Sequence, residues 1–91
     1  MFMLGLRRVI GDSMTPELAE NDLILVIRTK KYRVGNVVGF VFNNKILVKR
    51  ISEIKNGQYY VLGDNQKNSL DSRKLGWLSN DQIVFKMIHR F

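Results

Sequence analysis

The chain has 91 residues, enough for one domain with a small hydrophobic core, and we expect residues 1–91 to form a single domain. Its net charge of +7 favours an anionic partner such as nucleic acid or lipid, or simply keeps the protein soluble. The lack of cysteine excludes disulfides and the usual zinc sites, and the single histidine, His89, excludes a histidine cluster. We therefore expect no metal and no cofactor. Nucleic acid is not the expected partner, because no aromatic residues interleave the basic ones.

The first six residues are apolar and are followed by Arg7 and Arg8. This run is much shorter than the roughly 20 residues of a membrane-spanning helix. It also lacks the basic start and the cleavage site of a secretory signal. We expect residues 1–6 to form a first strand or a docking segment, and the protein to be cytoplasmic or peripheral at a membrane surface.

Residues 11–16, Gly-Asp-Ser-Met-Thr-Pro, place a serine at a predicted turn. The glycine before Ser13 and the proline after it favour a bend followed by one short helical turn. The first N–H groups of such a turn lack partners, so Ser13 is either a helix cap or a nucleophile beside an oxyanion site around Asp12 and Ser13. Taken alone the segment favours the cap, because serine followed by proline and glutamate is a common helix start.

Short apolar runs separated by turn residues make up most of the remaining chain. They are rich in β-branched and aromatic residues, and they predict strands at residues 23–27, 37–42, 45–54, 58–62 and 83–88. Turn signals lie at Gly35-Asn36, Asn43-Asn44 and Asn56-Gly57, and residues 63–76 are expected to form a polar loop. The pattern predicts an all-β fold, either a small antiparallel coiled sheet or a partly open barrel.

Lys49 interrupts an apolar row on the predicted strand 45–54. Alternate residues share a face of a strand, so Lys49 lies between Leu47 and Ile51. Burial on such a face lowers the pKa of a lysine, and a neutral lysine can act as a general base. Serine paired with lysine is a known form of activated nucleophile. The alternative is that the face lies at a sheet edge or that the lysine stem reaches out to solvent.

The polar loop 63–76 carries acidic and amide residues at alternate positions. A calcium loop is not expected, because Ser69 stands where such loops need glycine and Leu75 where they need glutamate. The simpler interpretation is a hydrogen-bonded surface loop in which Asp71 pairs with Arg73.

Three segments together resemble the motifs of type I signal peptidases and their relatives. Residues 11–16 resemble the nucleophile box, residues 48–51 (Val-Lys-Arg-Ile) the lysine box, and residues 63–73 (Gly-Asp-Asn-Gln-Lys-Asn-Ser-Leu-Asp-Ser-Arg) the last box. The resemblance extends over about residues 9–90 and implies an all-β fold of the LexA and signal peptidase type. It implies that Ser13 is the nucleophile and Lys49 the general base, and that Ser69 orients the lysine amine.

The same resemblance implies supporting roles for five further residues. Asp71 and Arg73 would form an ion pair near the site, and Met14 and Pro16 would shape the nucleophile turn. The backbone around Asp12 would contribute to the oxyanion site.

Only residues 52–62 separate the lysine box from the last box, where large bacterial signal peptidases carry a second β-domain. This compact form is most similar to the small maturation proteases of nickel-type superoxide dismutase. We expect a serine endopeptidase with a Ser13/Lys49 dyad that cleaves a leader, propeptide or internal segment of a protein substrate bound as an extended strand. The alternatives are a self-cleaving LexA-type regulatory peptidase and a non-catalytic basic module, on the same fold, that binds nucleic acid or an anionic membrane surface.

Overall fold

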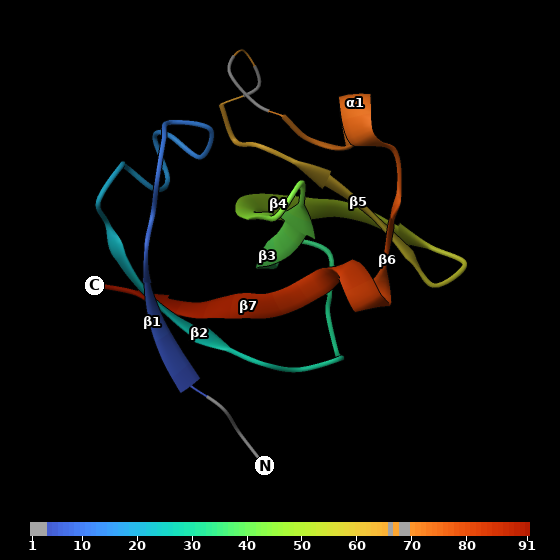
Figure 1. The fold of residues 1–91 in the computed structure, drawn as a ribbon, viewed down its shortest axis with the longest axis horizontal. Coiled ribbons are helices and arrows are strands. Elements are labelled where there is room, and N and C mark those ends of the chain that lie inside the picture. The colour runs from blue at the N-terminus through green and yellow to red at the C-terminus, as the bar shows by residue number, and fades with distance from the viewer. Residues whose placement is uncertain (1–3, 66, 68–69) are drawn as a thin grey trace.

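The computed structural model describes residues 4–65, 67 and 70–91. Within this part of the chain the elements are β1 (Leu4–Arg8), β2 (Leu23–Ile27), β3 (Val37–Phe42), β4 (Lys45–Lys55), β5 (Gln58–Leu62), α1 (Ser72–Leu75), β6 (Leu78–Ser79), the 3-10 helix η2 (Asn80–Gln82) and β7 (Ile83–Arg90). The strands form one antiparallel sheet in the order β1-β2-β7-β3-β4-β5-β6, which coils without closing (Figure 1). The predicted all-β fold, in its coiled and partly open form, is therefore confirmed.

All five strands predicted from the apolar runs are present. β4 and β7 extend slightly beyond the predicted ends, because polar residues at their tips still pair with β5 and β2. In the described part of the chain the first strand is Leu4–Arg8, which continues beyond residue 6 because both arginines remain in register with β2. Residues 1–3 lie outside the described residues.

Tight turns at asparagine connect the central strands, as the sequence predicts. The β3–β4 turn has positive φ at Asn43 (49°) and Asn44 (62°), and the β4–β5 turn has positive φ at Asn56 (52°) and Gly57 (74°). Asparagine and glycine tolerate this left-handed conformation, which matches the twist of a two-residue hairpin. These turns fix the register that places Lys49 opposite Val38 on β3.

The buried side chains form two hydrophobic clusters. One cluster includes Val38, Phe40 and Ile51, and the other includes Met14 and Phe85. Successive residues of a strand point to opposite faces, so the central strands contribute to both clusters. The second cluster lies beneath the loop that carries Ser13.

The loop between β1 and β2 is closed at its base by two backbone hydrogen bonds, from the Asn21 N–H to the Val9 oxygen (2.7 Å) and from the Val9 N–H to the Asp22 oxygen (2.9 Å). Within it, the Leu18 N–H donates to the Met14 oxygen (2.9 Å), which closes one isolated helical turn. The one short helical turn expected after Ser13 is therefore present, and it does not extend into a helix because the chain returns at once to β2. Pro16 lies inside the turn, and its peptide bond to the preceding threonine is cis.

The prediction of a purely polar loop at residues 63–76 is wrong at its end. Ser72–Leu75 form the short helix α1, whose first turn is capped by the Asp71 side chain, and β6 follows. A four-residue helix shows no apolar periodicity, so the sequence pattern did not reveal it. Among the described residues, no helix is both long and apolar enough to span a membrane.

Candidate active site

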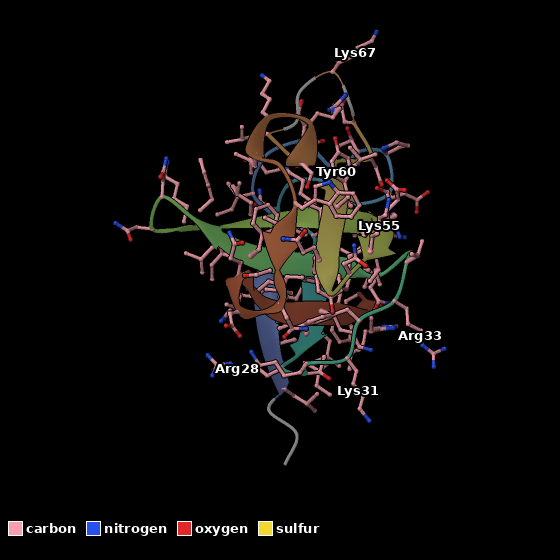
Figure 2. The ribbon with its side chains drawn as sticks, turned by 90° about the vertical axis from the view of Figure 1, so that its right-hand side faces the viewer. Arg28, Lys31, Arg33, Lys55, Tyr60 and Lys67 are labelled. Atoms are coloured by element: carbon pink, nitrogen blue, oxygen red, sulfur yellow. The ribbon has the colours of Figure 1, made fainter. Side chains whose placement is uncertain are left out.

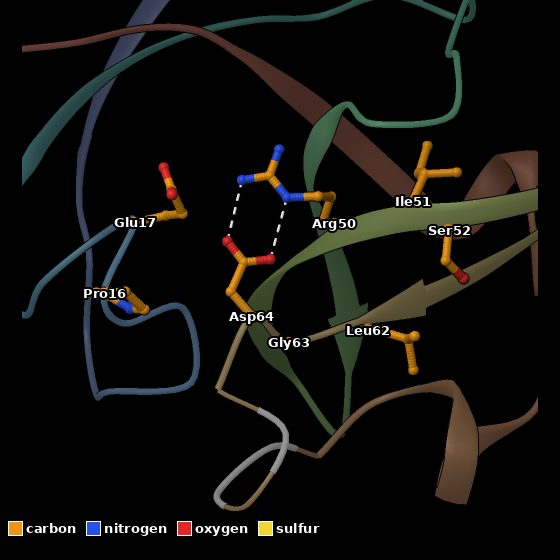
Figure 3. Close-up of a pocket in the computed structure, with 8 residues that line it drawn as sticks. All are labelled: Pro16, Glu17, Arg50, Ile51, Ser52, Leu62, Gly63 and Asp64. Atoms are coloured by element: carbon orange, nitrogen blue, oxygen red, sulfur yellow. Dashed lines mark hydrogen bonds and ion pairs between the residues drawn. The ribbon is translucent and has the colours of Figure 1, made fainter.

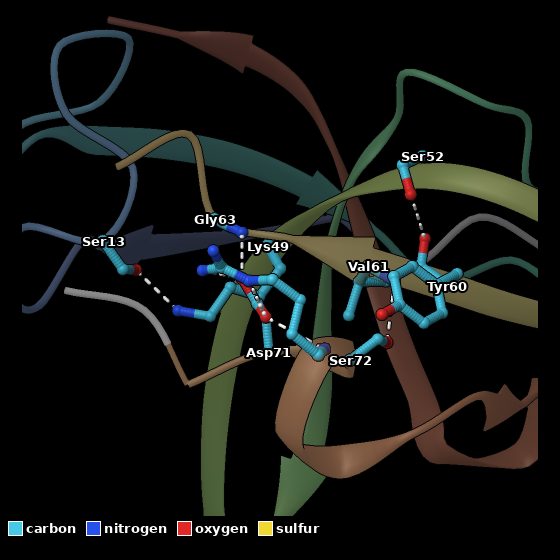
Figure 4. A network of polar contacts seen from close by, with 9 residues as sticks. Ser13, Lys49, Ser52, Tyr60, Val61, Gly63, Asp71 and Ser72 are labelled. Carbon is cyan, nitrogen blue, oxygen red and sulfur yellow. Dashed lines mark hydrogen bonds and ion pairs between the residues drawn. The ribbon is translucent and has the colours of Figure 1, made fainter. Parts of the chain in front are cut away.

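Ser13 and Lys49 come together where the β1–β2 loop meets strand β4. The Lys49 Nζ donates a hydrogen bond to the Ser13 Oγ at 2.6 Å (Figure 4). Strand β4 directs Lys49 inward and leaves the residue only 4% exposed. The alternative in which the lysine reaches out to solvent is therefore wrong, because the register with β3 and the loop of Ser13 enclose the side chain.

Burial lowers the pKa of Lys49 because an ammonium group inside the protein loses its hydration. The negative charge of Asp71 opposes this effect but is the smaller of the two. A lowered pKa increases the fraction of neutral amine at a given pH. A neutral amine can accept the proton of the neighbouring hydroxyl, whereas an ammonium group cannot.

Asp71 is completely buried beside this pair and is satisfied by several donors. Its two oxygens accept from the Gly63 N–H at 2.9 Å, from the Arg73 N–H at 3.1 Å, and from the Arg73 Nε and Nη2 at 3.0 Å each. Asp71 thus forms an ion pair with Arg73, caps α1 and holds the start of the loop at Gly63 (Figure 4). The carboxylate links the helix, the loop and the surroundings of Lys49.

The turn that carries Ser13 also contains three other residues named in the sequence analysis, Asp12, Met14 and Pro16. The Asp12 oxygen accepts from the Thr15 N–H at 3.1 Å and from the Thr15 Oγ1 at 2.9 Å, which tightens the turn. Met14 is 1% exposed and anchors the turn in the hydrophobic core. Pro16 faces an open depression on the far side of β4. Ser69 lies outside the described residues.

A second charged pair, which the sequence analysis missed, lies on the opposite face of β4. Arg50 donates from Nε and Nη2 to the two oxygens of Asp64, each at 3.0 Å, and from Nη1 to the Gly35 oxygen at 2.8 Å (Figure 3). The pair lines the depression together with Pro16, Glu17, Ile51, Ser52, Leu62 and Gly63. The signal was present in the sequence, since Arg50 follows Lys49 and Asp64 lies in the third motif, but their contact is long-range.

Asn65 is the other residue that the sequence analysis missed. Its backbone N–H donates to the Ser13 oxygen at 2.7 Å, and its Nδ2 donates to the Asp12 oxygen at 3.1 Å and to the Thr15 Oγ1 at 3.3 Å. The third motif therefore touches the nucleophile turn directly.

An apolar groove lies between the segments that lead into Ser13 and Lys49. Its lining residues are Arg7, Arg8, Ile10, Lys45, Ile46, Leu47, Val48 and Phe85. One wall belongs to β1 and the residues after it, and the other to the first half of β4. Within the part of the chain that the structure describes, no three His, Asp, Glu or Cys side chains are grouped so that they could hold a metal ion.

Comparison with known proteins identifies the family of this chain. Residues 3–87 match the family described as Peptidase S24-like, and the chain therefore belongs to that family. It is also 34% identical over 98 residues to signal peptidase IB of Staphylococcus aureus strains Mu50 / ATCC 700699, N315 and MW2, which covers 93% of this chain and 51% of each relative. The chain spans about half the length of these curated relatives. Both comparisons support a serine peptidase of the signal peptidase and LexA-like superfamily.

Proposed function

We propose that the protein is a serine endopeptidase in which Ser13 is the nucleophile and Lys49 is the general base. The observation that carries this proposal is the 2.6 Å contact between the Lys49 Nζ and the Ser13 Oγ, made by a lysine that is almost fully buried. A structural lysine at this position would be expected to pair with a carboxylate or to reach solvent. Lys49 instead contacts the Ser13 hydroxyl, and a serine hydroxyl beside a neutral amine is an activated nucleophile.

The chemistry follows the general scheme of activated serine nucleophiles. Neutral Lys49 takes the hydroxyl proton as the Ser13 Oγ bonds to the carbonyl carbon of the substrate, and the carbonyl oxygen becomes an oxyanion. The new ammonium returns that proton to the leaving amine, and an acyl-enzyme remains. Water then attacks the ester while Lys49 accepts its proton, and the Ser13 hydroxyl is restored.

Backbone N–H groups at the nucleophile turn would stabilise the oxyanion. Among the described residues, the Ser13 N–H donates to no other group and is available for this purpose. A donor of this kind contributes about 3–4 kcal/mol to transition-state stabilisation in related chemistry.

The substrate we propose is an extended segment of another protein. The apolar groove between β1 and the first half of β4 would hold such a segment, because its two walls belong to the segments that continue to Ser13 and Lys49. The natural substrate could be a leader, a propeptide or an internal segment. A superoxide dismutase propeptide remains one specific candidate, on the strength of the compact form of the chain.

The proposal is tested by cleavage of a mixture of unstructured peptides with small residues at varied positions. The wild-type protein is expected to cut a subset, and Ser13→Ala is expected to cut none. Ser79→Ala is the matched control, because its exposed hydroxyl belongs to the remote strand β6. Retained cleavage in Ser13→Ala, with the same products, would contradict the assignment of the nucleophile.

The binding-module alternative is not favoured. The outward-pointing basic side chains are dispersed over the surface, as the positions of Arg28, Arg33, Lys55 and Lys67 show (Figure 2). Such a distribution lacks the continuous stripe expected of a nucleic-acid binder. Regulatory self-cleavage of the LexA type is the second peptidase candidate, and detection of a self-cleaved product would favour it.

We also propose that the protein contacts an anionic membrane surface at its periphery. Leu4, Leu6 and Ile10 are 62%, 54% and 88% exposed, and Arg7 and Arg8 lie between them. Apolar side chains interleaved with arginines suit an anionic lipid surface. Sedimentation with anionic vesicles but not with neutral vesicles is expected, and no binding at low salt would remove this proposal.

A further inference from the structure

The three residues Gly63, Asp64 and Asn65 form a strap that joins strand β5 to the nucleophile turn. Each residue has an anchor of its own. The Gly63 N–H binds buried Asp71, and the Asp64 carboxylate binds Arg50 through two parallel hydrogen bonds. Asn65 then reaches the turn at Ser13. The strap is therefore fixed at two points before it touches the nucleophile.

Asn65 holds the turn through three hydrogen bonds that surround Ser13. Its N–H binds the carbonyl of Ser13 itself, and its side-chain amide binds the Asp12 carbonyl before Ser13 and the Thr15 hydroxyl after it. Thr15 in turn donates to the Asp12 carbonyl at 2.9 Å. The peptide units on both sides of the nucleophile thus both accept hydrogen bonds from Asn65.

Strand β4 provides both halves of the arrangement. It presents Lys49 to the Ser13 hydroxyl from one face and Arg50 to Asp64 from the other. Adjacent residues of one strand have fixed relative positions. Strand β4 therefore fixes the position of Lys49 and, through Arg50, the position of the strap. The distance between the Ser13 Oγ and the Lys49 Nζ then depends on the link from Arg50 through Asp64 to Asn65.

We propose that Asn65 is a positioning residue that sets Ser13 against Lys49, with the Arg50–Asp64 pair as its support. This proposal rests on the proposed peptidase function for its kinetic consequences, but its geometric consequence is independent of any activity. Reactions of held groups are sensitive to their placement, and a displacement of about 1 Å can cost about a hundredfold in rate.

The test compares Asn65→Ala with Asn80→Ala. Asn80 is a matched control, because its Nδ2 also donates to one backbone carbonyl, that of Lys30 (3.2 Å), and to one hydroxyl, that of Tyr59 (3.0 Å), away from Ser13. We expect Asn65→Ala to lower kcat about tenfold to a hundredfold with little change in KM, and Asn80→Ala to leave both unchanged. Thr15→Val, which removes one acceptor of Asn65 and the hydroxyl donor to the Asp12 carbonyl while keeping the side-chain volume, is expected to lower kcat by a smaller factor.

Crystal structures of the same variants give the second measurement. In Asn65→Ala the Ser13 Oγ and Lys49 Nζ are expected to separate beyond hydrogen-bond reach, and in Asn80→Ala to remain in contact. An unchanged distance together with an unchanged kcat in Asn65→Ala would overturn the positioning role, as would equal losses in the two alanine variants. If the wild-type protein cleaves no peptide, the proposed function fails, while the distance still decides the role of Asn65.

Discussion

Lys49 and Arg50 are neighbouring basic residues on β4 that have opposite environments. Lys49 points into the protein toward a hydroxyl, and burial lowers its pKa. Arg50 points to the other face, where its hydrogen bonds to Asp64 raise its pKa despite partial burial. One strand thus holds a cation that is made easier to deprotonate beside one that stays charged.

This difference shows that the direct hydrogen-bond partner of a buried basic side chain determines which role the side chain can have. A guanidinium that binds both oxygens of a carboxylate is satisfied in geometry and charge, so it serves to hold chain segments together. A lysine whose direct partner is neutral keeps the cost of its burial, and it can relieve that cost by losing a proton. Arg50 is therefore suited to support the site and Lys49 to act in it.

The largest expected effect comes from removing the amine of Lys49. Lys49→Met should lower kcat/KM by about a thousandfold or more, because the amine that contacts the Ser13 hydroxyl and would take its proton is then missing. The free energy of unfolding should stay equal or rise, since methionine fills a similar volume without a charge to desolvate. Peptide cleavage and thermal unfolding check both points. Lys55→Met, at the exposed end of the same strand, is the control and should behave as the wild-type protein does. Cleavage by Lys49→Met at the wild-type rate would contradict the role of Lys49 as the general base, and with it the difference in function between Lys49 and Arg50.

Removing the neighbouring arginine should mainly affect stability. Arg50→Ala leaves Asp64, whose side chain is only 17% exposed, without its partner, and a loss of about 1–2 kcal/mol of unfolding free energy is expected after allowance for solvent screening. Activity should fall about tenfold through the loosened strap. Denaturant unfolding and kinetics on the same preparation measure the two effects. Arg33→Ala, on an exposed loop, should change neither. A free energy of unfolding equal to that of the wild-type protein would contradict the stabilising role of the Arg50–Asp64 pair.

The pH dependence of cleavage distinguishes the role of Lys49 from that of Arg50. Its expected effect is smaller than the effects of the two substitutions. Lys49 is protonated below its lowered pKa and neutral above it, so kcat should rise with pH through that value and then level off below the ordinary lysine range near 10.4. Arg50 keeps its charge throughout and should not contribute. The rate profile of Arg50→Ala should accordingly be lower but should keep its midpoint. A profile that is flat from mildly acidic to alkaline pH would speak against Lys49 as the base.

The sequence predicted the parts of the molecule that depend on local pattern. Apolar runs gave the strands, paired turn residues at Asn43-Asn44 and Asn56-Gly57 gave the hairpins, and strand periodicity placed Lys49 on an apolar face. The resemblance to signal peptidases selected Ser13 as the residue that Lys49 would meet.

The sequence did not predict contacts that depend on how distant loops meet. Asp64 binds Arg50 and Asn65 binds the turn at Asp12 across 14 and 53 residues, and no local pattern specifies such pairs. The short helix α1 was missed because one buried carboxylate, that of Asp71, defines its start. Only the folded structure thus revealed the hydrogen bonds between polar side chains and groups that lie far apart in the sequence.

The most direct test of the account is a titration of the Lys49 side-chain nitrogen by NMR in ¹⁵N-lysine-labelled protein, with Lys49→Met used to assign the signal. The account predicts a midpoint well below the ordinary lysine value near 10.4 and equal to the midpoint of the kcat profile. A Lys49 midpoint at or above the ordinary value would contradict it, because the amine would then be an ammonium group at the pH where the protein must work.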